Sequence, residues 1–253
     1  MSQENPATNI PKNVIVKPGK KYTVVFCVPG KEFTSNFFLS WSETITSLAD
    51  KYNIIVSNKY SPQVNFARAM CLGGNVLSGP DQKPFNGELD YDVIMWLDSD
   101  MVFNSSMVNY LIEACIYKHP VVSGTYALEG GEHMCCVEKW DEDRYMKKGN
   151  FEFMKVEDAK NRVDTNNHWV KCAYTGMGCM AIRRGIMEDD RIKYPWFFRD
   201  ITTMTPEDKA KHIIREGTSE DVSFIRNLID GEIIDGVMVN LQIRFGHEKS
   251  AVF

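Results

Sequence analysis

The residues best suited to chemistry are two aspartates, Asp98 and Asp100, which follow the apolar run of residues 93–97. Unpaired carboxylates are costly to bury, so they seldom end a core strand for packing reasons alone. In an extended chain, residues two apart point to the same side, and both carboxylates would then meet at the end of the strand. Together with substrate phosphates they could hold a hard divalent cation. The alternative is a polar turn in which one aspartate caps the next helix.

Three more candidates for the same site lie later in the chain. Glu220 and Asp221 come just before an apolar pattern of helical spacing. Acidic residues suit a helix N-terminus, but one of them could instead face a pocket as a general base that takes the proton of an attacking hydroxyl. His247 is a candidate metal ligand, and an imidazole ligand favours a transition metal such as Mn²⁺ over Mg²⁺. A surface or hydrogen-bonded histidine is the alternative.

Asn65 and Arg68 are three residues apart on an expected helix, so they share one face of it. An arginine near the carboxyl edge of a sheet can pair with a phosphate or with a carboxylate of a metal site. An ordinary surface arginine is the other interpretation. Gly176 and Gly178 permit a tight turn or the close approach of a ligand.

The elements that must position these residues alternate along the first half of the chain. Apolar and β-branched runs predict strands, and apolar residues at helical spacing predict helices. The candidate caps are Thr34 or Ser35 for the first helix and Asn104 or Ser105 for the helix at 107–116. This β-α-β order predicts an α/β fold with a mostly parallel sheet and helices on both faces. Ligands of such sheets bind beyond the carboxyl ends of the strands. The expected strands are 22–28, 53–57, 93–97 and 120–126, and the expected helices are 37–48, 64–72 and 107–116.

The second half of the chain is less regular. Residues 129–168 are charged and lack periodicity, which indicates a loop over the site or, by default, a solvated surface. We expect Trp196 and Phe197 to lie in the hydrophobic core. Within the polar leader, residues 14–16 suggest a short edge strand. Further expected elements are strands at 170–182, 232–239 and 241–245 and a helix at 219–229.

The composition is that of an ordinary globular protein, with 43% hydrophobic and 25% charged residues in a chain of 253. A formal net charge of −5 argues against general attraction to nucleic acid or to an anionic membrane. We find no transmembrane segment and no signal-peptide core. Seven cysteines without a disulfide pattern favour a reducing compartment, so we expect a soluble, cytoplasmic protein. The P-loop, the GxGxxG fingerprint and the GxSxG and HExxH motifs are all absent.

The order of these features resembles the nucleotide-sugar-dependent glycosyltransferases of the GT-A fold. The resemblance extends over residues 22–247. It rests on the DxD at the strand end, the segment TGMGCMAIRR (175–184), the acidic pair before the late helix, and His247. It implies a Rossmann-type mixed, mostly parallel sheet flanked by helices in a single compact domain. Residues 1–20 would be a flexible leader, and the domain 21–253 would comprise a nucleotide-sugar-binding half (21–126) and an acceptor-binding half (127–253).

The resemblance also implies roles for the candidate residues. Asp98 would contact the donor ribose or the metal, and Asp100 and His247 would bind the metal. Asp221 would be the catalytic base of an inverting transfer, while Glu220 would orient the acceptor or support the site. The residues expected around the donor are Pro29, Asn65 and Arg68 at the nucleotide and Gly176 and Met177 at the transferred sugar. As an alternative to the core, Trp196 and Phe197 could form an apolar platform for a sugar ring.

The expected activity is therefore that of a hexosyl- or pentosyltransferase. It would move a sugar from a UDP- or GDP-linked donor to a hydroxyl of a glycan or glycoprotein, with Mn²⁺ rather than Mg²⁺. Two alternatives stay open. A metal-dependent nucleotidyltransferase would release pyrophosphate and usually has a basic, glycine-rich loop after the first strand, where this chain has PGKEFTSN. A non-catalytic protein on the same scaffold would only bind the sugar nucleotide.

Overall fold

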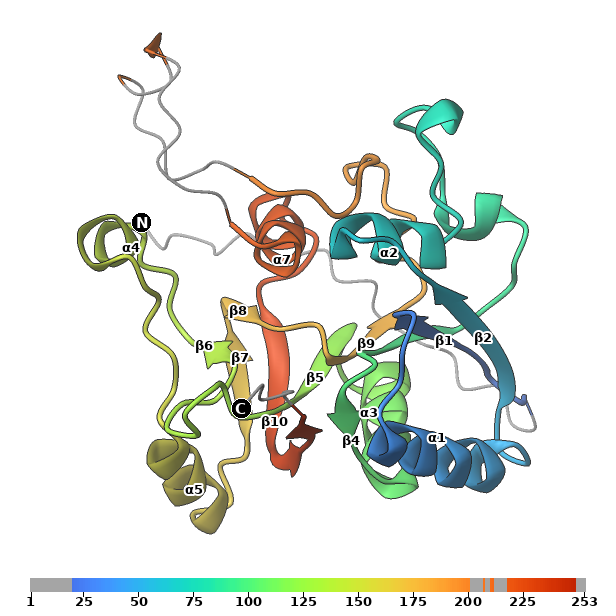
Figure 1. Cartoon of the computed structure of the whole chain (residues 1–253), viewed down its shortest axis with the longest axis horizontal. Helices are drawn as coiled ribbons and strands as arrows, with labels where there is room; N and C mark the ends of the chain where they lie inside the picture. The colour runs from blue at the N-terminus through green and yellow to red at the C-terminus, as the bar shows by residue number, and fades with distance from the viewer. Residues whose placement is uncertain (1–19, 201–206, 208–209, 212–217, 249–253) are drawn as a thin grey trace, which may run out of the picture.

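The computed structural model describes residues 20–200, 207, 210–211 and 218–248 (Figure 1). The expected strand at 14–16 and all of the expected leader except Lys20 lie outside these residues. In the described part, seven strands form one sheet in the order β2-β1-β3-β9-β5-β10-β7. These strands are β1 (Thr23–Pro29), β2 (Asn53–Lys59), β3 (Val93–Leu97), β5 (Val121–Thr125), β7 (Trp169–Cys172), β9 (Cys179–Arg183) and β10 (Val237–Arg244).

The sheet is mixed and mostly parallel, as predicted. Strands β2, β1 and β3 pair in parallel, and so do β5 and β10. Strand β9 lies antiparallel between β3 and β5, and β7 runs antiparallel to β10 at the edge. Two short ladders complete the strands: β4 (Met101–Val102) pairs with β11 (Gly246–His247), and β6 (Cys136–Val137) pairs with β8 (Tyr174–Thr175).

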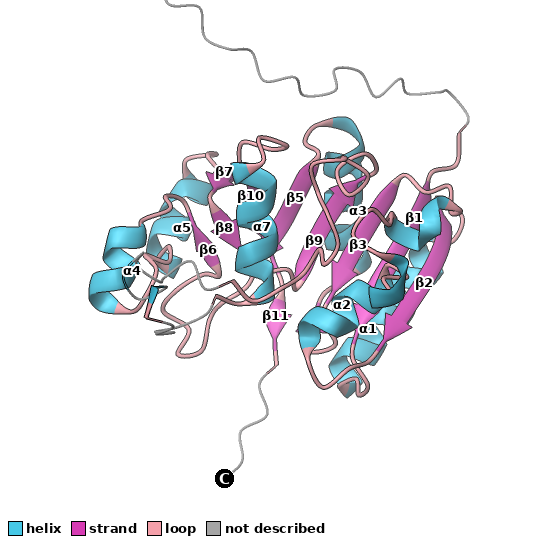
Figure 2. Cartoon of the chain, turned by 90° about the horizontal axis from the view of Figure 1, so that it is seen from above, coloured by secondary structure: helices cyan, strands magenta, loops and turns pink. Residues whose placement is uncertain are grey.

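Helices cover both faces of the sheet (Figure 1). Helices α1 (Ser35–Leu48) and α3 (Ser105–Tyr117) lie on one face, and α2 (Val64–Cys71) and α7 (Glu220–Asp230) lie on the other, in front of the strands in Figure 2. Of the candidate caps, Thr34 and Asn104 act as N-caps, while Ser35 and Ser105 begin the helices. Thr34 Oγ1 accepts from Phe37 N at 3.0 Å, and Asn104 Oδ1 accepts from Met107 N at 3.0 Å. Such caps satisfy amide groups that have no partner inside the helix.

The strand pleat divides the apolar residues between two core clusters. On β3, Ile94 and Trp96 join the cluster under α2 and α7, whereas Val93, Met95 and Leu97 join the cluster over α1 and α3. This alternation is the period of two that a strand imposes on its side chains. It also decides on which side of the sheet the next residue, Asp98, emerges.

Two expectations for the second half need correction. Residues 129–168 are not merely a loop or a solvated surface, since they contain β6 and the helices α4 (Glu142–Lys148) and α5 (Val156–Asp164). The strands expected at 232–239 and 241–245 are one strand, β10. The polar residue between them, Asn240, is fully buried, and its Oδ1 accepts from Gln242 N at 2.9 Å. The pairing with β5 shifts register between Val239 and Arg244, but the strand continues.

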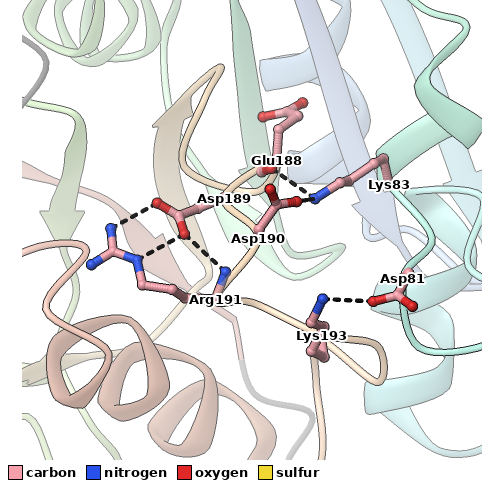
Figure 3. Close-up of polar contacts among 7 residues, drawn as sticks. All are labelled: Asp81, Lys83, Glu188, Asp189, Asp190, Arg191 and Lys193. Atoms are coloured by element: carbon pink, nitrogen blue, oxygen red, sulfur yellow. Dashed lines mark hydrogen bonds and ion pairs between the residues drawn. The ribbon is translucent and has the colours of Figure 1, made fainter.

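Trp196 and Phe197 belong to the core, as expected, with 0% and 1% of their surface exposed. The segment before them is fastened to the loop around the 3-10 helices η1 (Val76–Ser78) and η2 (Pro84–Gly87) by ion pairs (Figure 3). Lys83 pairs with Asp190 at 2.7 Å, and Lys193 pairs with Asp81 at 2.6 Å. The same segment meets Tyr91, just before β3, through Glu188. The network therefore lies at the opposite end of β3 from Asp98.

Candidate functional site

Asp98 leaves the end of β3 on the side of α2, where it meets Arg68. Nη2 of Arg68 donates to Oδ2 of Asp98 at 3.1 Å, and Nη1 lies 3.0 Å from Oδ1. The arginine also lies over the ring of Trp96, with its central carbon 5.5 Å from the ring centroid. The pleat of β3 explains this arrangement, because Trp96 and Asp98 are two residues apart and emerge on the same face.

Arg68 has a second carboxylate partner, Glu220, at the start of α7. Nε of Arg68 donates to Oε1 of Glu220 at 3.0 Å, and the side chains are 3% and 9% exposed. Burial acts to lower the pKa of Arg68, but the charges of Asp98 and Glu220 raise it overall, so the guanidinium stays charged. A phosphate could reach this arginine only by displacing a buried ion pair. The structure thus gives Arg68 a bridging place between β3 and α7.

Asp100 meets His247 because the chain returns to this edge of the sheet after β10. The pairing of β11 with β4 sets His247 opposite Met101, and Glu248 N donates to the carbonyl of Asp100 at 2.9 Å. Nε2 of His247 then lies 3.1 Å from Oδ2 of Asp100. The rings of His247 and Tyr126 pack edge to face, with their centroids 5.0 Å apart. A residue far along the chain thereby lies beside the aspartate motif.

The two aspartates do not meet each other in the way that an extended strand would allow. Residues 98–100 form a turn between β3 and β4, closed by a hydrogen bond of 3.1 Å from Met101 N to the carbonyl of Asp98. Asp98 therefore faces Arg68 while Asp100 faces His247. The turn interpretation was right about the backbone, but the helix cap is Asn104 rather than an aspartate.

The spacing of Oδ2 of Asp100 and Nε2 of His247 suits two ligands of one divalent cation. Two ligands about 2.1 Å from an octahedral ion and at right angles lie roughly 3.0 Å apart, close to the 3.1 Å between these nitrogen and oxygen atoms. The carboxylate of Asp100 is 40% exposed, which leaves it accessible. No group of three His, Cys, Asp or Glu residues among those described is arranged to hold a metal. A cation here would need further ligands from a substrate or from water.

Asp221 follows Glu220 in the first turn of α7 and is half-buried. Tyr174 donates to its Oδ2 at 3.0 Å, and Val222 N donates to its Oδ1 at 2.8 Å. Ser219 stands at the N-cap position, but its hydroxyl donates to Oδ1 of Asp221 and accepts no hydrogen bond from the helix backbone. Burial, followed by the charge of Glu220, raises the pKa of Asp221. A raised pKa makes this carboxylate a stronger base.

Pro29 lines an open pocket at the carboxyl ends of β1 and β2. The pocket has a volume of about 420 Å³, and its lining includes Lys31, Tyr60 and Ser99. Ser99 stands between the two aspartates, so the pocket adjoins the motif. Nζ of Lys31 lies 5.8 Å from the centroid of the Tyr60 ring. Asn65, in the first turn of α2, is half-buried.

Gly176 and Met177 are enclosed by protein. A Cβ on Gly176 would lie 2.0 Å from the hydroxyl of Tyr126 and 2.8 Å from Sγ of Cys135. Packing against these side chains therefore accounts for the glycine. The side chain of Met177 is fully buried in the core. Its main chain is enclosed as well, because the whole residue has 0% of its surface exposed.

Two tyrosines of the site were not predicted from the sequence. The ring of Tyr126 lies beside His247, and the hydroxyl of Tyr174 donates to Asp221. Tyr126 directly follows β5, and Tyr174 is the first residue of β8. Their signal is weak in the sequence, because an aromatic residue at a strand end is ordinary core material.

The sequence matches no model of a known protein family and no curated protein. Solved structures with a similar chain path include A197 from STIV, at 14% identity and a TM-score of 0.47 over 91% of this chain and 96% of that one. Another is glucosyl-3-phosphoglycerate synthase from Mycobacterium tuberculosis in complex with Mn²⁺, UDP and glucosyl-3-phosphoglycerate. It is 13% identical, with a TM-score of 0.45 over 91% of this chain and 73% of that one. A glycosyltransferase involved in glycosylation of the major capsid of PBCV-1 is 10% identical, with a TM-score of 0.38 over 90% of this chain and 96% of that one. Since these TM-scores lie below 0.5, the case for a function rests on the site.

Proposed function

We propose that this protein is a metal-dependent glycosyltransferase that moves a sugar from a nucleoside-diphosphate sugar to a hydroxyl of a glycan or glycoprotein. The observation that carries the proposal is that two clusters of polar side chains lie at the same end of β3. Arg68 joins Asp98 to Glu220, and β11 brings His247 to Asp100. Among the described helices, no segment is long and apolar enough to cross a membrane.

In this proposal, Asp100 and His247 hold the cation, with Mn²⁺ favoured over Mg²⁺ by the imidazole. When bound, the cation would neutralise negative charge on the departing diphosphate. The pocket beside Pro29 takes the nucleoside, and the carboxylate of Asp98, which is 27% exposed, faces the ribose. Arg68 orients Asp98 instead of contacting phosphate directly, since both carboxylates already occupy its guanidinium.

Asp221 is the proposed general base of an inverting transfer. It takes the proton of the acceptor hydroxyl as that oxygen bonds to the anomeric carbon. The bond from this carbon to the diphosphate oxygen breaks, and its electron pair leaves with the nucleoside diphosphate. Glu220 keeps Asp221 in place through its ion pair with Arg68. In the division that we propose, residues 21–126 supply most donor contacts and residues 127–253 supply the base and the acceptor side.

A thermal-shift screen tests this function. UDP, GDP and their sugars are added with Mn²⁺, and we expect at least one to raise the melting temperature, because a ligand at 100 times its dissociation constant stabilises the folded state by about 2.7 kcal/mol. Asp100→Ala should abolish the shift, whereas Asp235→Ala, which removes an exposed carboxylate paired with Lys171, should preserve it. Failure of every nucleoside diphosphate with every divalent ion would refute the proposal.

The products separate this function from its alternatives. The stabilising donor is incubated with the protein, and the released nucleotide is identified by chromatography. A nucleoside diphosphate, from transfer or slow hydrolysis, supports a glycosyltransferase. In a parallel incubation with a nucleoside triphosphate and a sugar 1-phosphate, release of pyrophosphate would indicate a nucleotidyltransferase. A donor that stays intact after prolonged incubation would indicate a binding protein.

A further inference from the structure

The two oxygens of the Asp221 carboxylate have different surroundings. Oδ1 accepts two hydrogen bonds, one from the hydroxyl of Ser219 and one from Val222 N. Within the described part of the chain, Oδ2 accepts one, from the hydroxyl of Tyr174 at 3.0 Å. A carboxylate oxygen has room for about two such bonds. The acceptor positions of Oδ1 are therefore filled, while Oδ2 keeps one position open.

From this inequality we propose that Oδ2 of Asp221 is the atom that takes the proton from the acceptor hydroxyl, and that Tyr174 is the positioning residue that aims it. The inference rests on the proposed function, in which Asp221 is the base. The hydroxyl proton of the acceptor passes to Oδ2, whose lone pair forms the new O–H bond. Tyr174 keeps its own proton throughout and holds the carboxylate plane in one orientation.

Tyr174 is suited to this work because its own position is fixed. Its side chain is buried, with 6% of its surface exposed, and it lies on β8, which pairs with β6. The rings of Phe151 and Phe153 pack against it with centroid distances of 6.0 and 6.3 Å. Both come from the segment 129–168, for which the sequence indicated a loop over the site or a solvated surface. This segment therefore supports the partner of the base.

The charged and titratable groups that face Asp221 come from two other parts of the structure and from α7 itself. Arg68 projects from α2 and Cys135 lies just before β6, while Glu220 is its neighbour on α7. Burial and Glu220 raise the pKa of Asp221, whereas Ser219, Arg68 and the hydroxyl of Tyr174 lower it. Removing that hydroxyl takes away a donor that stabilises the charged carboxylate, so the pKa should rise further.

The test compares the wild-type protein with Tyr174→Phe, which keeps the ring and removes the hydroxyl. Tyr91→Phe is a matched control, since Tyr91 is also buried and donates its hydroxyl to a carboxylate, that of Glu188, at the far end of β3. The pKa of Asp221 is followed by NMR on protein with ¹³C-labelled aspartate carboxyls, and its signal is assigned by its loss in Asp221→Asn. We expect a higher pKa in Tyr174→Phe and no change in Tyr91→Phe.

Turnover of the donor found in the thermal-shift screen gives the second measurement. Since hydrogen bonds to charged groups are worth more than neutral ones, kcat in Tyr174→Phe should fall by roughly tenfold or more, with an unchanged KM for the donor. The acid limb of the pH profile should move to higher pH. An unchanged carboxyl pKa together with normal kcat would overturn the role of Tyr174. If Asp221→Asn itself had normal turnover, the assignment of the base would fail instead.

Discussion

At the scale of single residues, the charges of the site are arranged around Arg68. Its guanidinium is 3% exposed and lies between the carboxylates of Asp98 and Glu220. Removing one member of a buried ion pair leaves an uncompensated charge, which is far more costly than the loss of a surface pair. This cost holds Asp98 and Glu220 in fixed positions, and it places Asp221 beside them.

Asp221 itself should lower the stability of the protein at neutral pH. The pKa of Asp221 is raised in the folded state, so its carboxylate binds a proton more tightly in the folded than in the unfolded protein. The contribution of Asp221 to the free energy of unfolding is then most favourable below the ordinary aspartate pKa of about 3.9. This contribution is lost as the pH rises through the raised pKa. We expect Asp221→Asn to increase the free energy of unfolding at pH 7, measured by urea denaturation, and to lose most of this advantage near pH 4.

The same variant should lose sugar transfer by roughly 10²- to 10⁴-fold, the usual contribution of a general base, while it still binds the donor. Gain of stability with loss of activity is the pattern expected when a functional group is buried at a cost. Equal stability of the two proteins at pH 7 would contradict the raised pKa of Asp221. A variant that is more stable but fully active would agree with the raised pKa of Asp221 and would show that Asp221 is not the general base.

At the scale of elements, short strands place the site. The two-residue ladder of β4 and β11 sets His247 beside Asp100, and the ladder of β6 and β8 sets Tyr174 beside Asp221. Between these ladders, Tyr126 follows β5 and packs against both His247 and Gly176. The loop after β8 therefore has to pass close to an aromatic ring, which only a residue without a side chain allows.

Gly176→Ala should therefore reduce stability through overpacking. A methyl group would lie 2.0 Å from the hydroxyl of Tyr126 and 2.8 Å from Sγ of Cys135. Overpacking of this kind costs about 1–3 kcal/mol, measured as the free energy of unfolding in urea. Tyr126→Phe in the same chain removes the nearest obstructing atom and should recover part of the loss. A double variant no more stable than Gly176→Ala alone would show that the hydroxyl is not the obstacle.

At the scale of the whole molecule, the two halves of the chain share one sheet. Strand β9, from the second half, lies between β3 and β5 of the first, and β10 pairs with β5. Both core clusters draw residues from both halves. The site is built across the same division, because Arg68 and Asp98 come from one half and Glu220 and His247 from the other.

A fragment of residues 20–126 should consequently fail to fold. Without β9, strands β3 and β5 lose the neighbour that joins them, and their apolar side chains lose much of their burial. We expect no cooperative transition when this fragment is titrated with urea and followed by circular dichroism. The full chain should give coincident transitions by circular dichroism and tryptophan fluorescence. A cooperatively folded fragment would mean that the first half is an independent domain.

The sequence by itself determined the elements of the first half and the edge of the sheet where chemistry gathers. Strand β3 has the predicted bounds, and the caps Thr34 and Asn104 are in place. These features are local, since periodicity and capping depend on residues a few positions apart. The sequence also singled out the aspartates, the acidic pair and His247, because charged groups at strand and helix ends are visible without a fold.

The tertiary structure alone decided which of these groups meet. Nothing local shows that Asp98 turns to Arg68 while Asp100 turns to His247, or that the hydroxyl of Tyr174 reaches Asp221. These pairs join residues far apart in the chain, and the sheet order that brings them together depends on the insertion of β9 between β3 and β5. Strand pairing is set by which faces can be buried together, and that is a property of the assembled core and not of any one segment.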